Sequence, residues 1–294
     1  MSHIKTAVFP VAGLGTRFLP ITKSVPKEML PLIDKPLIQY AVEEARAAGI
    51  EKFVFVSSPE KTMLNDYFRT NLRLEDHLSS KNKSDALRLV RDINLSPKSF
   101  WVTYQTEALG LGHAIWTAKE FLKDEPFAVL LPDDFIYSDR SAIGQMIEAH
   151  AEIGGNMVAT MEVEREAISS YGCLDVKSRS GRCLSALGMV EKPEMDKAPS
   201  TQAVIGRYIL QPSVLDTLST VNPDASGEIQ LTDAIAADIV RNDLWGYEFD
   251  GQRYDCGTKI GYLEATIAVA MDRKELAPAL YRSLALNSET EVAA

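Results

Sequence analysis

The residues most able to do chemistry stand in a glycine-led loop near the N-terminus, between residues 12 and 36. Gly13 and Gly15 let backbone N–H groups approach phosphate oxygens without an intervening Cβ. Arg17 and Lys27 follow them and can neutralise the charge that those oxygens carry. Because the whole chain has a net charge of −10, a locally basic loop of this kind predicts a site for a small polyanion.

Two common phosphate-binding motifs do not fit this loop. A dinucleotide fingerprint needs a third glycine, and the sequence has Phe18 at that position. A P-loop needs Gly-Lys-Ser/Thr, whereas Thr16 and Arg17 follow the second glycine here. An NAD-dependent dehydrogenase is therefore disfavoured. For the glycines alone, a surface loop with solvated charges stays an alternative.

Carboxylate and amide side chains follow two other apolar runs. Residues 127–131 predict a buried strand, and Asp133 and Asp134 come directly after it. A carboxylate at such a strand end suits Mg²⁺, a hard cation that takes oxygen ligands, although it can also cap a helix. Gln105 ends a second run, and its amide could pair a donor and an acceptor with a base edge.

The elements that must position these residues alternate in type. Apolar runs that predict strands occupy residues 7–12, 53–57, 101–105 and 127–131. Residues 36–48 and 114–122 predict helices, and residues 60–93 are charged and mostly helical. This alternation indicates an α/β fold of Rossmann-like type, with a doubly wound, mostly parallel mixed sheet. Because ligands bind beyond the carboxyl ends of such strands, the glycine loop, Gln105 and Asp133 are expected to converge.

Several stretches together resemble the signature of the sugar-1-phosphate nucleotidyltransferases. They are residues 13–20, 26–31, 34–36, 171–172, 190–193, 206–208, 227–233 and 254–259. The resemblance extends over about residues 4–265, nearly the whole chain. Within the family, Ala12 before the first glycine and the pair Lys27-Glu28 are most similar to the uridylyl type. Thymidylyl relatives usually have Gly-Gly and Lys-Gln at these places.

The resemblance implies an activity, a cofactor and roles for single residues. It implies transfer from UTP to glucose 1-phosphate, with Mg²⁺ as cofactor and UDP-glucose and pyrophosphate as products. Catalysis would depend on Arg17, Lys27, Asp133 and Lys192. Substrate binding would involve Ala12, Gly13, Gly15, Glu28, Gln105, Gly110, Gly172 and Glu191. The metal would be held by Asp133 and Asp255, although Asp255 could equally cap a helix that begins near Thr258.

In this scheme each part of the substrates meets its own residues. Gln105 and Gly110 read the uracil, while Glu191 and Lys192 hold the sugar hydroxyls and the sugar phosphate. A solvent-exposed charge pair is the alternative for Glu191 and Lys192. His113 stands at an expected helix start, which suggests a packing role and not that of a general base.

The second half of the chain has a different pattern of predicted secondary structure. From Met157 onward, strand-like runs follow one another with few helices between them, which predicts a strand-rich extension of the same sheet. We expect one domain over residues 1–270, with a nucleotide-binding half at 1–150 and a sugar-binding half at 151–270. A helix is expected over 264–286, and residues 271–294 would then comprise its end and a frayed tail.

Composition narrows the class of protein further. The chain has 294 residues, of which 46% are hydrophobic and 24% charged, as in an ordinary globular protein. Three cysteines without C-x-x-C spacing suggest neither disulfides nor zinc. No signal-peptide core or membrane-spanning run is visible, so a cytoplasmic protein without a membrane partner is expected. The net negative charge also argues against a nucleic-acid partner. A homodimer or homotetramer is expected, because the predicted C-terminal helix could support contacts between copies.

Other activities stay open at this point. A thymidylyl- or cytidylyltransferase would share the chemistry and differ only in base and sugar. A non-catalytic regulatory paralogue would keep the fold but should lose some of the four expected catalytic residues. All four are present in this sequence, which disfavours a paralogue of that kind.

Overall fold

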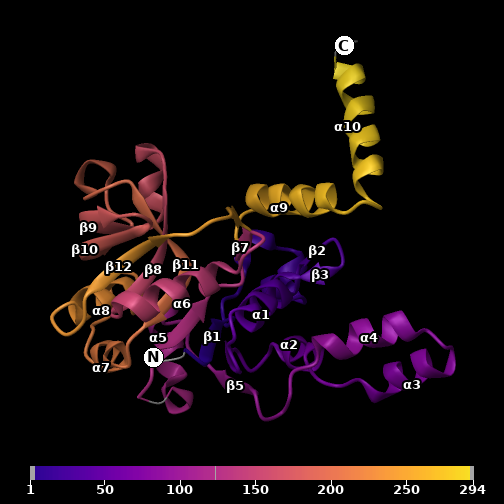
Figure 1. Ribbon diagram of the computed structural model, residues 1–294, viewed down its shortest axis with the longest axis horizontal. Coiled ribbons are helices and arrows are strands. Elements are labelled where there is room, and N and C mark those ends of the chain that lie inside the picture. The colour runs from indigo at the N-terminus through magenta and orange to yellow at the C-terminus, as the bar shows by residue number, and fades with distance from the viewer. Residues whose placement is uncertain (1–3, 123, 292–294) are drawn as a thin grey trace.

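In the computed structural model, which describes residues 4–122 and 124–291, nine strands join in one mixed sheet (Figure 1). Their spatial order is β5 (Phe100–Tyr104), β4 (Lys52–Ser57), β1 (Thr6–Pro10), β6 (Phe127–Leu130), β11 (Gln202–Leu210), β8 (Asn156–Glu162), β12 (Leu244–Glu248), β10 (Cys183–Glu191) and β9 (Gly172–Ser180). The sheet therefore continues from the first half of the chain into the second.

The four strands β5, β4, β1 and β6 are parallel and come from the first half of the chain. Val8 of β1 pairs with Val54 of β4 and with Val129 of β6, and all three side chains are fully buried. Buried, β-branched residues of this kind are typical of a parallel sheet covered on both faces. At β11 the sheet becomes mixed, because β11 is antiparallel to both β6 and β8.

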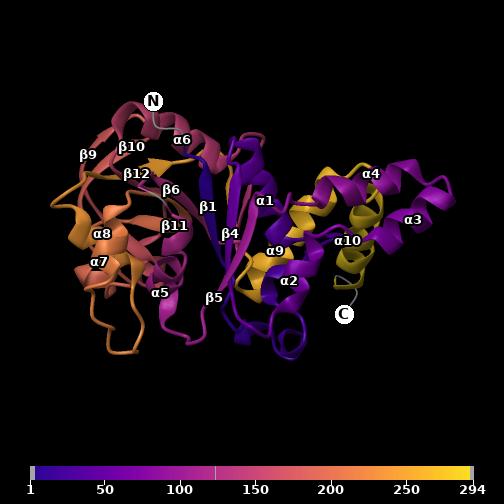
Figure 2. The ribbon, with the colours of Figure 1, turned by 90° about the horizontal axis from the view of Figure 1, so that it is seen from below.

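Helices cover both faces of the sheet. They are α1 (Leu37–Ala47), α5 (Gly110–Thr117), α6 (Ala142–Ile153), α7 (Ser213–Leu218) and α8 (Leu231–Asp238). The helices α1 and α6 share a core with Phe9 and Phe55, while α5, α7 and α8 pack with Val8 on the opposite face. Figure 2 shows α5, α7 and α8 on one side of the sheet and α1 on the other. The predicted doubly wound α/β architecture is confirmed.

Two short antiparallel pairs lie outside the main sheet. β7 (Asp134–Tyr137) pairs with β13 (Gln252–Asp255), and this register sets Asp134 opposite Asp255. β2 (Pro31–Leu32) pairs with β3 (Lys35–Pro36) just before α1. The β7–β13 pair thereby brings a late segment of the chain to the point where β6 ends.

The charged segment predicted to be helical over residues 60–93 forms three helices. They are α2 (Thr62–Tyr67), α3 (Leu72–Ser80) and α4 (Ser84–Ile93), and residues 81–83 separate α3 from α4. Figure 1 shows α3 and α4 extending away from the sheet. No predicted site residue lies on either of them.

The described chain ends in two helices where one was predicted. These are α9 (Lys259–Asp272) and α10 (Ala277–Glu291), so the single helix expected over 264–286 is wrong. The reason is Pro278, because proline is tolerated in the first turn of a helix but not in its interior. The tail expected to fray is helical as far as Glu291, and its last residues, 292–294, lie outside the described residues.

Figure 1 shows α10 pointing away from the rest of the molecule. In the ranges that the structure describes, no helix combines the length and the apolar character needed to cross a bilayer.

Candidate active site

The glycine loop after β1 folds over the side chain of Lys27. Gly15 has a φ of 66°, in the left-handed region that glycine adopts without strain. An ideal Cβ on Gly15 would lie only 3.0 Å from Lys27 Cβ, so the close approach also requires glycine. Thr22 Oγ1 donates to Gly15 O at 2.8 Å and closes the loop from outside. The glycine loop therefore packs directly against the side chain of Lys27.

Lys27 reaches the end of β6. Its Nζ lies 2.5 Å from Asp133 Oδ2, and each side chain is 24% exposed. Burial lowers the pKa of Lys27, but the carboxylates of Asp133 and Glu28 raise it, so its net pKa is above the ordinary value. Burial raises the pKa of Asp133, but Lys27 outweighs this effect and the net pKa is lowered. Both groups are therefore charged at neutral pH.

Asp134, the neighbour of Asp133, is occupied by protein contacts. Its Oδ2 accepts a hydrogen bond from Gly206 N at 2.8 Å, and its Oδ1 accepts one from Arg253 Nε at 2.6 Å. Arg253 Nη1 also donates to the hydroxyl of Tyr171 at 3.0 Å. Asp134 thus joins the end of β6 to β11 and β13, whereas Asp133 is the carboxylate of the pair that contacts Lys27.

Asp255 lies close to Asp133. Cys256 N donates to the main-chain O of Asp133 at 2.8 Å, which joins the two segments. An ideal Cβ on Gly257 would lie 2.9 Å from Asp255 Oδ1 and 3.1 Å from Asp133 Oδ2. The two carboxylates therefore face one small space that only a glycine leaves open. The alternative role of Asp255 as a helix cap is wrong, because Thr258 Oγ1 caps α9 by accepting from Gly261 N.

The two carboxylates are ligands of the type that suits a magnesium ion. Mg²⁺ is commonly bound by one or two carboxylates, with water and substrate phosphates completing its six oxygen ligands. Within residues 4–122 and 124–291, no group of three or more His, Cys, Asp or Glu side chains is placed to hold a metal. Asp133 and Asp255 therefore offer the two-carboxylate type of site and not a site closed by protein alone.

A cavity of about 720 Å³ opens at the carboxyl ends of the parallel strands. Eight predicted residues line it: Ala12, Gly13, Gly15, Lys27, Glu28, Gln105, Gly110 and Asp133. These residues come from the glycine loop, the end of β5, the start of α5 and the end of β6. The expected convergence of these strand ends is thus what the fold produces.

The wall formed by α5 is fixed by a later loop. Gly112 N donates to Ile229 O at 2.9 Å, and Ile229 N donates to Leu109 O at 2.8 Å. Gly110 has a φ of 86°, and a Cβ there would lie 2.8 Å from Glu228 Cβ. The glycine at position 110 is therefore required by the approach of residues 228–229, whether or not it also contacts a base.

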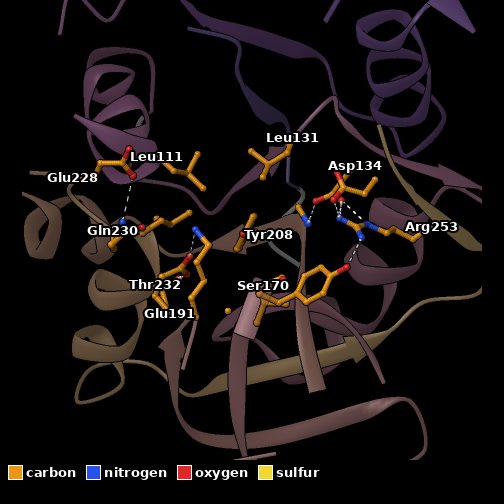
Figure 3. A pocket seen from close by; sticks show the side chains of 17 residues that line it. Leu111, Leu131, Asp134, Ser170, Glu191, Tyr208, Glu228, Gln230, Thr232 and Arg253 are labelled. Carbon is orange, nitrogen blue, oxygen red and sulfur yellow. Dashed lines mark hydrogen bonds and ion pairs between the residues drawn. The ribbon is translucent and has the colours of Figure 1, made fainter. Parts of the chain in front are cut away.

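A second cavity of about 280 Å³ lies beside the first. The predicted residues Gly172, Glu191, Lys192 and Asp255 line it. Figure 3 shows Asp134 and Arg253 on one side of this cavity and Glu191, Thr232 and Gln230 on the opposite side. Leu111, Leu131 and Glu228 line both cavities, so the two share a wall.

Glu191 is held in place by two neighbours. Its Oε2 accepts a hydrogen bond from Thr232 Oγ1 at 2.6 Å, and its Oε1 lies 3.3 Å from Lys192 Nζ. Lys192 has a φ of 41°, an uncommon conformation for a residue with a side chain, and its N donates to Tyr171 O at 3.0 Å. Strained backbone of this kind is concentrated at functional sites. The Lys192 side chain is 61% exposed and that of Glu191 25%, so the alternative of a solvent-exposed charge pair still describes Lys192 but not Glu191.

Arg17 lies apart from the other predicted residues. It is exposed and lines neither of these two cavities. It lines a third cavity, with Arg253 and Asp255, at the N-terminal end of α9. Its Nη1 would lie 3.8 Å from a Cβ on Gly257, so it borders the space between the carboxylates of Asp133 and Asp255.

Two cations of the site could not be singled out in the sequence. Lys61 Nζ donates to Val11 O at 2.6 Å and to Gly13 O at 2.5 Å, and it pairs with Glu28 Oε2 at 3.1 Å. Arg253 is the other, two positions before Asp255. Neither stands in a distinctive motif, and only the tertiary fold gives them their partners.

Glu28 is fully buried next to Lys61. Burial raises its pKa, although Lys61 and Lys27 act to lower it. Its Oε1 has no hydrogen-bond partner in the part of the chain that the structure describes. The glycine loop is thus built on a buried carboxyl group that lines the larger cavity.

Comparisons with known proteins agree with this arrangement. A relative from Komagataeibacter xylinus named UTP–glucose-1-phosphate uridylyltransferase is 49% identical over 257 residues, which cover 87% of this chain and 90% of the relative. UTP–glucose-1-phosphate uridylyltransferase 2 of Staphylococcus saprophyticus is 46% identical, with 92% and 93% covered.

Solved structures show the same fold. A UDP-glucose pyrophosphorylase complexed with UDP-glucose superposes with a TM-score of 0.83 at 43% identity, covering 92% of this chain and 100% of the other. A UTP-bound UGPase from Acinetobacter baumannii gives a TM-score of 0.88 at 36% identity, with 96% and 98% covered.

The resemblance noted in the sequence is thereby confirmed. A model of the nucleotidyl transferase family matches residues 7–272. This match contains the glycine loop, both cavities and the two carboxylates that face each other across Gly257. The chain belongs to the nucleotidyl transferase family.

Proposed function

We propose that the chain is an enzyme that forms UDP-glucose and pyrophosphate from UTP and glucose 1-phosphate. The observation that carries the proposal is the pair of adjacent cavities. One has a glycine loop and Lys27 suited to a nucleoside triphosphate, and the other has Glu191 and Lys192 suited to a sugar phosphate. Their shared wall lies beside Asp133 and Asp255, where the two substrates would meet.

The reaction needs little covalent help from the protein. A phosphate oxygen of glucose 1-phosphate attacks the α-phosphorus of UTP in line, and the bond to the pyrophosphate oxygen breaks. The attacking oxygen already carries charge near neutral pH, so no general base has to remove a proton. The main barrier is the approach of two anions, and catalysis therefore consists of positioning and charge stabilisation.

Cations on both sides of the shared wall would perform this task. Lys27, held under the glycine loop, would bind the triphosphate. Lys192 would place the attacking phosphate, while Glu191 would accept hydrogen bonds from sugar hydroxyls. Arg17 borders the space between the two carboxylates, where it would contact phosphate oxygens of the triphosphate.

Mg²⁺ would be held by Asp133 and Asp255, which both face the space that Gly257 leaves open. When bound, it would supply Lewis acidity and a template for the phosphate oxygens. Lys27 must then share or release Asp133 Oδ2, and a phosphate oxygen is the natural new partner for its ammonium group.

A matrix of substrates tests the proposal. Pyrophosphate release would be measured with UTP, dTTP, ATP and CTP against glucose, galactose and N-acetylglucosamine 1-phosphates. We expect the highest kcat/KM for UTP with glucose 1-phosphate. A higher value for dTTP would replace the proposal with a thymidylyltransferase, and no release with any pair would favour a regulatory paralogue.

The proposal has three further parts. The nucleotide-binding half ends at residue 150, the protein forms a homodimer or homotetramer, and it is located in the cytoplasm. The three cysteines are free thiols, which fits a reducing compartment such as the cytoplasm. The projecting helix α10 exposes Tyr281 and Leu284, which fits contact with further copies in a homodimer or homotetramer. Light scattering of the purified protein measures the number of copies.

A further inference from the structure

Gln105, the expected base reader, has no free hydrogen-bond donor. Its side-chain Nε2 donates to Gly110 O at 3.1 Å and lies 3.0 Å from His113 Nδ1. A side-chain amide has two N–H hydrogens, and these two partners occupy both of them. The sequence alone suggested that this amide could offer both a donor and an acceptor to a base. The structure leaves only the acceptor.

His113 must accept a hydrogen bond for this arrangement to hold. A carbonyl can only accept, so Gly110 O determines which end of the amide carries the nitrogen. That nitrogen can only donate, so His113 Nδ1 carries no proton and the ring proton is on Nε2. His113 lies in the first turn of α5, and its ring stacks on Trp116 with 6.2 Å between ring centroids. The ring is thus held in position by its own helix.

The free oxygen of Gln105 belongs to the larger cavity. The residue is 8% exposed and lines that cavity, and its main-chain N donates to Ser57 O at 2.8 Å. No hydrogen bond to its Oε1 is formed within the described residues, 4–122 and 124–291. This oxygen is therefore available to accept a hydrogen bond from a donor on a ligand in the cavity.

We propose that His113 is a positioning residue for base selection: Gly110 O fixes the orientation of the Gln105 amide, and His113 engages the remaining N–H, so that only the oxygen is offered to the base and selects one with an N3–H group. The inference rests on the proposed function, because it concerns the nucleotide of that reaction. Uracil and thymine carry a hydrogen on N3, whereas N3 of cytosine is itself an acceptor and would meet the Gln105 oxygen with like charge. His113 thus rejects CTP without touching the nucleotide, and it does not separate UTP from dTTP.

The test compares nucleotide ratios in three variants. In His113→Ala, one N–H of Gln105 becomes free to face the cavity, and the ratio of kcat/KM for UTP to that for CTP should fall about tenfold, as expected for one lost hydrogen bond. The UTP to dTTP ratio should not change, since both bases present N3–H. His113→Gln restores an acceptor and should restore the UTP to CTP ratio. His77→Ala, on exposed α3, is the matched control and should change neither ratio.

Several results would overturn the inference. An equal loss with UTP, CTP and dTTP in His113→Ala would assign His113 a structural role only. An unchanged UTP to CTP ratio in that variant would do the same, and so would a low ratio in His113→Gln. The wild-type protein gives a check that does not depend on the folding of variants. It should bind 3-methyl-UTP at least about tenfold more weakly than UTP, since N3–H is absent, and equal binding would refute the acceptor role.

The outcome also separates this inference from the proposed function. A wild-type protein that prefers ATP or CTP would refute the proposed function before any variant is made. If the wild-type protein selects UTP but the ratio of kcat/KM for UTP to that for CTP is unchanged in His113→Ala, only the positioning role of His113 is refuted.

Discussion

Lys27 Nζ and Asp133 Oδ2 lie 2.5 Å apart, so the cation proposed to bind the nucleotide and a carboxylate proposed to bind the metal neutralise each other. The two residues are 106 positions apart in the sequence and meet because parallel strands end at one edge of the sheet. Removing one partner of such a half-buried pair leaves the other charge without compensation. Variants of the two residues are therefore expected to show different defects.

Asp133→Asn tests the metal site. We expect the variant to fold, since the amide has nearly the same shape, and to lose Mg²⁺ binding measured by calorimetry. Its kcat should fall at least about a hundredfold, because a bound metal contributes several kcal/mol to such a reaction. Asp139→Asn, an exposed change nearby, is the control. A folded variant with full activity would end the metal hypothesis for Asp133.

Lys27→Ala and Lys192→Ala test the division of labour between the cavities. Lys27→Ala should weaken UTP binding about ten- to a hundredfold, the value of a lost hydrogen bond to a charged group. Lys192→Ala should leave UTP binding nearly intact and lower kcat/KM for glucose 1-phosphate by a similar or larger factor. Calorimetric titration of UTP into both variants separates the two cases.

The control for these lysines is Lys197→Ala, an exposed residue that pairs only with exposed Glu194 among the described residues. If Lys192→Ala abolished UTP binding while Lys27→Ala spared it, the assignment of the two cavities would be reversed.

Gly257→Ala tests the space between the two carboxylates. The added Cβ would lie 2.9 Å from Asp255 Oδ1 and 3.1 Å from Asp133 Oδ2, which is where the metal is proposed to sit. We expect Mg²⁺ affinity to fall at least about tenfold, while UTP binding in the presence of EDTA stays within about twofold of wild type. Gly188→Ala, where an added Cβ meets no atom within 4 Å, is the control. Unchanged Mg²⁺ affinity would place the metal elsewhere.

Glu28→Gln tests the buried carboxyl group under the glycine loop. Burial holds the pKa of Glu28 above its ordinary value of 4.5, although Lys61 and Lys27 act to lower it. A carboxyl group with a raised pKa in the folded state destabilises the fold as pH rises from the ordinary value through the raised one. Glutamine does not titrate, so the Tm of the variant minus that of wild type should increase as pH rises above 4.5.

Thermal melts between acid and neutral pH measure this difference. Glu51→Gln, on the exposed surface, should show no such trend. A difference that is constant or decreases with pH would mean that Lys61 and Lys27 outweigh the burial of Glu28.

The parts of the site that could be predicted are those fixed by strand ends. Gly13, Gln105 and Asp133 each stand at the end of an apolar run or shortly after it, and a parallel sheet brings such positions together whatever the details of packing. Lys27 belongs to the loop that follows the first of these runs. Gly172 and Glu191 were assigned through their motifs, and they line one cavity. In the fold, the sheet and its covering helices followed from hydrophobic periodicity.

What could not be predicted depends on contacts between distant segments. Lys61 and Arg253 have no distinctive sequence context, and their partners are carbonyl and carboxylate groups that only the folded chain assembles. Arg17 stands in the strongest motif of the chain, yet it lies in a short turn and lines a different cavity from Gly13 and Lys27. The donors of Gln105 are another example, because sequence cannot show that Gly110 and His113 occupy them.

The strand β11 has a consequence for any attempt to cut or rearrange this chain. It forms main-chain hydrogen bonds with β6 from the first half and with β8 and β9 from the second. Residue 150 is therefore not a boundary at which the chain could be divided. A fragment ending there would expose the edge of β6, and exposed strand edges promote aggregation. The same hydrogen bonds also hold the two halves of the chain together in one continuous sheet.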